Sequence, residues 1–259
     1  EVRGTMARAG RQRVALVLVA LSCQRAAAEA PLFSEWLRTE AGPQWERVVG
    51  HRFTRELAAG RLRNETLRSY LVQDHRFLDD FSVLLASAIA AAPTLDDRVP
   101  GAQFLALVTS TENTYFSRAL RALGMSAPAE AAVADAPITT RFKRLMRSAA
   151  HSGKLANMLA VLVVAEWSYE TWGERAVAER APALDWWHAE WIELHAGPYF
   201  SSVVAYLRGL LDRSGEKLGE ADRLEARSLF LEAVDCEEAF FNHAYAEPLA
   251  EPPDAKSEL

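Results

Sequence analysis

Two observations in the sequence predict an all-α protein that folds as a multi-helix bundle. From Leu32 onward, apolar residues recur at spacings of three and four along almost the whole chain, as one face of a helix requires. Alternating runs of β-branched residues, which would predict strands, are lacking, and the turn signals between helices are short. The chain has 259 residues and is 50% hydrophobic, which is enough to bury one sizeable core. We therefore expect one helical domain over residues 31–247.

Capping residues and helix breakers give the order of the elements. The expected helices cover residues 65–91, 101–123, 138–152, 154–180, 184–194, 199–213 and 220–245. Asn64 is a suitable N-cap for the first of them, and Pro93 follows its end. Gly124 and Gly153 stop the second and third, and the Ala- and Pro-rich stretch between these two helices is expected to be a loop. Helix 154–180 is apolar on more than one face, which predicts a central position.

The two ends of the chain differ from this domain. Residues 6–28 contain no acid and four arginines, and an apolar run of about ten residues is followed by small residues. This is typical of a secretory signal or an organellar transit peptide, and an artefactual extension is a third interpretation, so the compartment stays open. The run is too short to cross a bilayer, which takes about twenty residues, and no membrane anchor is expected. Residues 248–259 are expected to form a flexible tail.

Composition argues against several classes of function. The net charge is −6 and the basic residues are scattered, so nothing favours binding to nucleic acid. The only cysteines are Cys23 and Cys236, which cannot build a disulfide framework or a cysteine-based zinc site, and Cys236 is expected to be a packing residue. No glutamate has a histidine three positions later, as a di-iron bundle would require. His51 could in principle ligate haem, but a helix-terminal histidine is the simpler interpretation.

Carboxylates among aromatic residues are the strongest indication of function. On a helix, Asp74 shares a face with Phe77 and Phe81, and Glu166 shares one with Tyr169. Glu237 likewise shares a helix face with Phe240 and Phe241, which follow it by three and four residues. A carboxylate in an aromatic setting loses water, and its pKa rises unless a donor compensates. This combination suits a flat ligand with amino groups and ring nitrogens along one edge.

With these segments in view, the chain resembles the TenA family, also called thiaminase II, which has a haem-oxygenase-like helical fold. The resemblance covers residues 33–245, and four segments carry it. These are Leu71 to Asp74, Glu166 to Gly173, Trp191 with the downstream Gly197-Pro198-Tyr199-Phe200, and Glu237 to Phe241. The resemblance implies an enzyme that acts on thiamin or on pyrimidine products of its breakdown, without a metal or redox cofactor, and a homo-oligomer, either dimer or tetramer.

The resemblance also implies roles for individual residues. Asp74 matches the acid that binds the aminopyrimidine ring, Tyr169 the tyrosine beside the nucleophile, and Glu237 the glutamate that pairs with the edge of the ring. The well-studied branch carries a catalytic cysteine where this chain has Ala165. Glu166 follows directly, and this is similar to the branch in which a glutamate replaces the cysteine.

Two other positions depart from the family pattern. Phe77 stands where a tyrosine is common, and His195 stands where an aromatic residue is common; both are expected to bind substrate. The working hypothesis is a hydrolase that releases ammonia from an aminopyrimidine or formate from a formylaminopyrimidine in thiamin salvage. Glu166 would then act as general base or proton shuttle, with Tyr169 and Glu237 assisting. The alternatives are a non-catalytic pyrimidine-binding or regulatory protein, and a haem-oxygenase-like oxidase of the PqqC or di-metal type.

Overall fold

The computed structural model describes residues 31–250, and within them the chain forms helices and no strand. The helices are α2 (Phe33–Ala41), α3 (Pro43–Val49), α4 (Arg52–Ala58), α5 (Asn64–Ala91), α6 (Leu95–Leu107), the π-helix η1 (Val108–Glu112), α7 (Asn113–Ala122), α8 (Ala127–Ala132), α9 (Pro137–His151), α10 (Leu155–Glu179), α11 (Trp186–Leu194), α12 (Pro198–Gly215) and α13 (Glu220–Ala246). The all-α prediction is therefore confirmed. The predictions for residues 1–30 and 251–259 lie outside the described residues.

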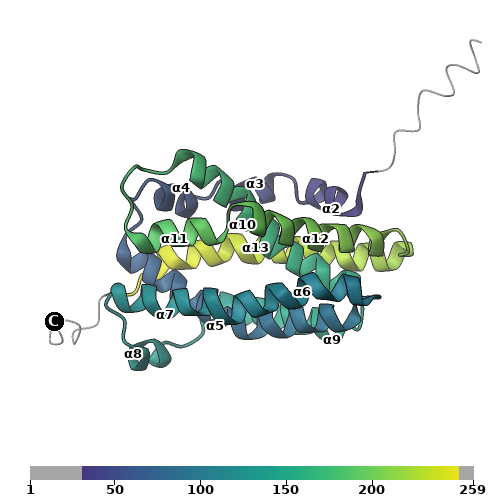
Figure 1. The fold of residues 1–259 in the computed structure, drawn as a ribbon, viewed down its shortest axis with the longest axis horizontal. Helices are drawn as coiled ribbons and strands as arrows, with labels where there is room; N and C mark the ends of the chain where they lie inside the picture. The colour runs from purple at the N-terminus through teal and green to yellow at the C-terminus, as the bar shows by residue number, and fades with distance from the viewer. Residues whose placement is uncertain (1–30, 251–259) are drawn as a thin grey trace, which may run out of the picture. The chain divides into compact units, whose positions relative to one another are not determined.

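The hydrophobic helix α10 lies at the centre of the bundle, as predicted. It packs against α5, α9, α12 and α13. Figure 1 shows these long helices lying roughly along one direction, with α2 to α4 along an edge of the bundle. Residues 156–169 of α10 are all buried, which explains why its sequence lacks a polar face. Three long helices, α5, α10 and α13, thus meet in the interior.

The segment expected as one helix over 101–123 is instead three helical pieces. Helix α6 begins earlier, at Leu95, because the Thr94 hydroxyl accepts a hydrogen bond from the backbone N–H of Asp97 (3.1 Å) and caps it. Pro100 lies inside α6, and the helix continues past it. The π-helix η1 then interrupts the helix before α7 continues. This interruption was not predicted.

Two further details differ from the sequence expectations. Asn64 is the first residue of α5 and Arg63 precedes it, and no side chain caps that end of the helix. The expected loop after Gly124 contains the short helix α8, and the chain beyond it is attached to α5. Gln73 on α5 donates to the carbonyl of Ala134 (3.0 Å) and accepts from the backbone N–H of Ala136 (2.9 Å), so one side-chain amide satisfies buried backbone groups of the connection.

The chain stays in contact with the bundle after its last helix ends. The backbone N–H of Leu249 donates to the carbonyl of Glu65 on α5 (3.1 Å), so the chain remains attached to the bundle beyond the end of α13.

Between residues 31 and 250, none of the helices has the length and apolar character needed to cross a membrane.

Candidate active site

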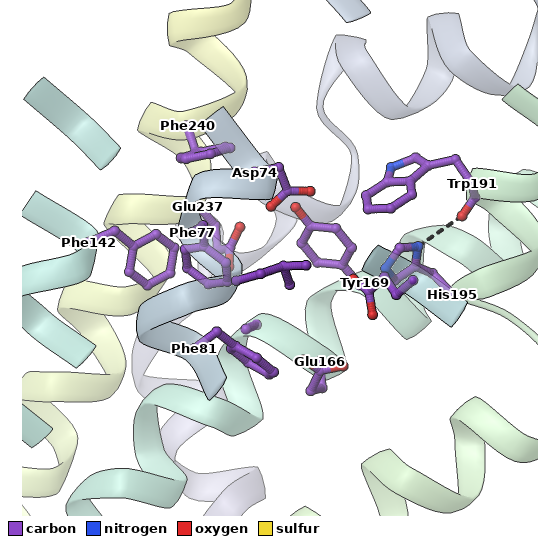
Figure 2. A pocket seen from close by; sticks show the side chains of 13 residues that line it. Asp74, Phe77, Phe81, Phe142, Glu166, Tyr169, Trp191, His195, Glu237 and Phe240 are labelled. Atoms are coloured by element: carbon purple, nitrogen blue, oxygen red, sulfur yellow. Dashed lines mark hydrogen bonds between the residues drawn. The ribbon is translucent and has the colours of Figure 1, made fainter. Parts of the chain in front are cut away.

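A cavity inside the bundle brings the predicted site residues together. About 470 Å³ of space free of protein atoms, part of it open to solvent, lies between its walls. Its walls come mainly from α5, α10 and α13, closed by η1, α9 and the end of α11. The lining residues are Asp74, Phe77, Leu78, Phe81, Glu112, Phe142, Ala165, Glu166, Tyr169, Trp191, His195, Glu237 and Phe240. Figure 2 shows most of them around the common space.

All six residues predicted for the site line this cavity: Asp74, Phe77, Glu166, Tyr169, His195 and Glu237. Sequence reasoning missed Tyr70, which touches the site through Tyr169, and Glu112 and Phe142, which line it. Tyr70 lies one helical turn before Asp74, so the same spacing rule could have found it. Glu112 has Tyr115 and Phe116 three and four residues later, the spacing that Glu237 has with Phe240 and Phe241, so the same rule could have found Glu112 as well.

Four carboxyl groups share the cavity: Asp74, Glu112, Glu166 and Glu237. None of the ion pairs within residues 31–250 involves any of them, and the one cationic influence is that of His75, which slightly opposes the rise in the pKa of Asp74. Burial disfavours the charged form of each group, and like charges in the same cavity add to this for Glu112, Glu166 and Glu237. The pKa of Asp74 is raised to about 7 and that of Glu112 to about 8, while the pKa values of Glu166 and Glu237 lie well above the usual range.

Two tyrosines connect Asp74 to the opposite wall. The hydroxyl oxygens of Tyr70 and Tyr169 are 2.5 Å apart, and Tyr70 also hydrogen-bonds Asp74. An ionised Asp74 can only accept, so Tyr70 then donates to Asp74 and its oxygen accepts the hydroxyl proton of Tyr169. This bond opposes the effect of burial on the pKa of Asp74. In Figure 2 the hydroxyl of Tyr169 points toward Asp74, while Glu166 lies across the cavity from them.

His195 contributes a neutral imidazole. Its Nδ1 donates to the backbone carbonyl of Trp191 (2.8 Å), because a carbonyl can only accept. Burial lowers the pKa of His195 to about 4, so Nε2 is left with a lone pair and can accept a hydrogen bond. The position of His195 depends on Gly173 of α10, since a Cβ there would lie 2.3 Å from the His195 carbonyl oxygen. The ring also contacts Tyr169, at a centroid distance of 4.9 Å.

The cavity contains no thiol. Ala165 lines the cavity and stands at the position that the sequence comparison above matches to a cysteine. Glu166, the next residue, also lines the cavity. Cys236 is fully buried next to Glu237 but does not line the cavity. Burial raises its pKa to about 12, so a thiolate does not form there at neutral pH. The interpretation of Cys236 as a packing residue agrees with this environment.

The metal and haem alternatives find no support in the arrangement of potential ligands. Among the described residues, no group of three or more His, Cys, Asp or Glu side chains is placed to hold a metal ion. Both nitrogens of His51 are engaged: Nδ1 accepts from the backbone N–H of Phe53 (3.1 Å), and Nε2 pairs with Asn242 (3.3 Å). His51 is therefore the N-cap of α4 and not a free ligand.

Comparison with known proteins agrees with this architecture. The sequence profile of the TENA/THI-4/PQQC family matches residues 38–247, which is most of the chain. The chain belongs to this family. A relative named aminopyrimidine aminohydrolase, from Halalkalibacterium halodurans, is 24% identical over 83% of this chain and 96% of its own length. A relative of the same name from Bacillus subtilis is 24% identical over 82% of this chain and 89% of its own.

Solved structures of other proteins have a similar fold. A TenA homologue from Pyrococcus furiosus superposes with a TM-score of 0.75 at 23% identity, over 83% of this chain and all of that one. A Shewanella denitrificans domain described as having a heme oxygenase-like fold superposes with a TM-score of 0.63 at 10% identity, over 85% of this chain and 94% of that one. The predictions of a TenA-type chain and of a haem-oxygenase-like bundle are both confirmed.

Proposed function

We propose that this protein is a hydrolase of thiamin salvage that releases ammonia from an aminopyrimidine. The observation that carries the proposal is the cavity itself, where four carboxyl groups without a cation face a neutral imidazole between aromatic walls. A flat ring with amino groups supplies the donors that these acceptors lack, and its faces pack on the aromatic rings. Relatives named aminopyrimidine aminohydrolase support the same reaction class.

Asp74 and Glu237 are the proposed ring-binding groups. Each can accept from an exocyclic amino group or exchange a proton with a ring nitrogen, and their raised pKa values keep a proton available near neutral pH. Phe77 and Tyr169 would pack on the ring, and Nε2 of His195 would accept a further hydrogen bond from the ligand. Burial makes each of these polar contacts selective, because a ligand without the matching donor leaves a buried group unpaired.

Glu166 is the proposed proton shuttle. Burial and the neighbouring acids raise its pKa well above the usual range, which favours the protonated form, and a protonated Glu166 can give its proton to the departing amine. The hydroxyl of Tyr169, one turn further along α10, would orient the substituent. Ala165 beside Glu166 leaves space for the water that attacks and offers no competing nucleophile.

The test is an assay of the full chain against an aminomethylpyrimidine, its N-formyl derivative and thiamin, following ammonia and formate. We expect ammonia from the first substrate; formate from the second would extend the activity to deformylation. Glu166→Gln should lower kcat by about 10²-fold or more, the usual contribution of a general acid or base. Glu170→Gln is the matched control, since Glu170 lies one turn away on α10 and outside the cavity.

The opposite outcomes are equally clear. Ligand binding without release of ammonia or formate would identify a pyrimidine-binding protein and contradict the proposal. Full activity of Glu166→Gln would exclude Glu166 as the shuttle. Assembly into a dimer or tetramer stays a prediction; the exposed apolar side chains Val83, Leu95 and Val99 of α5 and α6 are compatible with it.

A further inference from the structure

Glu112 is the cavity carboxyl that our sequence analysis did not predict. It is the last residue of η1, in the middle of a long helical stretch, and its side chain is half-buried. It lines the same cavity as Glu166. None of the hydrogen bonds or ion pairs within residues 31–250 involves its carboxyl group. A carboxyl group in a cavity without a partner is available to a ligand.

Glu112 ends a π-helical turn, and two hydroxyl groups bond to the backbone beside it. Thr109 donates to the carbonyl of Leu105 (2.8 Å), and Ser110 donates to the carbonyl of Ala106 (2.5 Å). Such bonds to the carbonyl four residues earlier compete with the backbone N–H and slightly destabilise an α-helix. Turns with i→i+5 bonds inside helices are frequent at functional sites.

Glu112 lies on the face of the helix that points into the bundle. Val108 is buried at the start of η1, and Tyr115 and Phe116 are buried in α7 after it. Glu112 follows Val108 by four residues and precedes Tyr115 by three, and these spacings place side chains on one helix face. The side chain of Thr111, beside Glu112, is exposed. The carboxyl of Glu112 is therefore directed to the same interior as the buried aromatic residues.

The charged and titratable surroundings of Glu112 are those of the cavity. They are Asp74 and His75 on α5, Glu166 and Tyr169 on α10, Glu237 on α13, and His195 after α11. Among charged neighbours, Glu112 has the largest effect on the raised pKa of Glu166. Its own pKa is raised to about 8, by burial and by Asp74, whereas three neighbouring acids add to the effect of burial on the pKa of Glu166. Two interacting acids with different pKa values can act as base and acid in one reaction.

We propose that Glu112 is a second proton-transferring residue of this site, which accepts a proton from the attacking water while Glu166 gives one to the departing amine. The inference rests on the proposed aminohydrolase function and adds a residue to it.

The proposed step balances without another reactant. Protonated Glu166 transfers its proton to the amine nitrogen, and the bond between carbon and nitrogen breaks, so that ammonia leaves with the electron pair. Water forms the new bond to that carbon and gives a proton to the Glu112 carboxylate. The proton then passes from Glu112 to Glu166, which restores both groups. The sum is amine plus water giving alcohol plus ammonia.

The test compares Glu112→Gln with the wild-type full chain in the ammonia assay over a range of pH. We expect kcat to fall by about 10²-fold or more and KM to change by less than about threefold, because the lost group acts on the reacting water. Wild-type activity should rise with pH as Glu112 ionises, and this rise should be absent from the variant. Thr111→Ala is the control, since its exposed side chain belongs to the same turn; it should keep wild-type kinetics.

Two further variants separate a proton-transferring role from packing. Glu112→Asp keeps the carboxylate and should restore part of kcat together with the rise with pH. The double variant Glu112→Gln with Glu166→Gln should be no more than about threefold slower than Glu166→Gln alone, because residues that act as a unit are not additive.

Each contrary result has a definite meaning. If the wild type releases no ammonia, the proposed function and this inference both fall. If the wild type is active and Glu112→Gln keeps its kcat, only the inference falls, and the same holds if the variant changes KM alone. If Glu112→Gln does not fold, the comparison of Glu112→Asp with the wild type tests the inference instead. If the activity of a folded Glu112→Asp does not rise with pH, the proton-transferring role of Glu112 is overturned.

Discussion

Two aspartates on helix α5 have the same chemistry and opposite surroundings. Asp80 is 3% exposed and accepts hydrogen bonds from Arg147, including one of 3.1 Å from Nη2; Lys143 lies 3.6 Å away. Asp74 is 8% exposed, less than two turns earlier, and no cation pairs with it. Lys143 also binds Asp135 (3.0 Å), so the region around Asp80 is a network of ion pairs.

The presence of an ion-pair partner distinguishes a structural acid, such as Asp80, from an acid that can bind a ligand, such as Asp74. A buried charge with its counter-charge present contributes to the folded state, and removing one partner is costly. A buried carboxyl without a cation raises the free energy of the folded protein until a ligand supplies the missing donors. Burial alone would not distinguish Asp74 from Asp80. The presence or absence of a cation does.

The largest effects are expected from replacing each of the two aspartates in turn, which tests this contrast directly. Asp74→Asn should lower activity on the aminopyrimidine by about 10²-fold or more, with Tm unchanged or raised, because a buried unpaired acid is removed. Asp80→Asn should lower the free energy of unfolding by about 2–4 kcal/mol, because Lys143 and Arg147 lose their buried partner, and leave the activity of each folded molecule unchanged. Ammonia release and thermal melts measure both. Loss of stability in Asp74→Asn with unchanged activity would reverse the assignment.

The second prediction concerns the effect of pH on stability. In the unfolded chain these carboxyls lose their protons near pH 4, while in the folded protein Asp74 and Glu112 lose theirs near pH 7 and 8. Between these values the folded state binds more protons than the unfolded state, so the free energy of unfolding should fall as pH rises. Thermal melts from pH 5 to 8.5 should show Tm falling by several degrees.

The ion-pair region provides the control for that experiment. Lys143 and Arg76 lower the pKa of Asp135 despite some burial, so its contribution to stability is present at neutral pH and is lost only as pH falls below about 4. Asp74→Asn should reduce the fall of Tm between pH 5 and 8.5, and Asp135→Asn should leave it unchanged. An equal slope in the wild type and in Asp74→Asn would contradict a raised pKa at Asp74.

The smallest expected effect concerns the wall that holds His195. Gly173→Ala places a methyl group 2.3 Å from the His195 carbonyl oxygen, which must move, so we expect about 1–3 kcal/mol of destabilisation and a raised KM. Gly209→Ala is the matched substitution on α12, because its new methyl group would meet only the end of Arg213 at 3.7 Å. It should be neutral or stabilise by up to about 1 kcal/mol. Denaturant unfolding compares the two, and equal effects would show that His195 is not held by this contact.

Much of the site could be predicted from sequence because it follows local helical spacing. Asp74 with Phe77, and Glu166 with Tyr169, share helix faces by the rule of three and four residues, and the structure directs each pair into the cavity. The sequence alone also determined that these acids come from three different long helices. Their convergence with Glu237 and His195 is a matter of packing, and the resemblance to TenA proteins was needed to expect it.

Other properties were decided only by the tertiary structure. Asp74 and Asp80 look alike in sequence, and only the packing of α9 against α5 brings Arg147 and Lys143 to one of them. The π turn η1 interrupts the helix that carries Glu112, and a regular spacing of 3.6 residues gives no sign of this interruption. Helical periodicity is a local property fixed by the backbone, whereas the partner of a buried charge depends on residues distant in sequence.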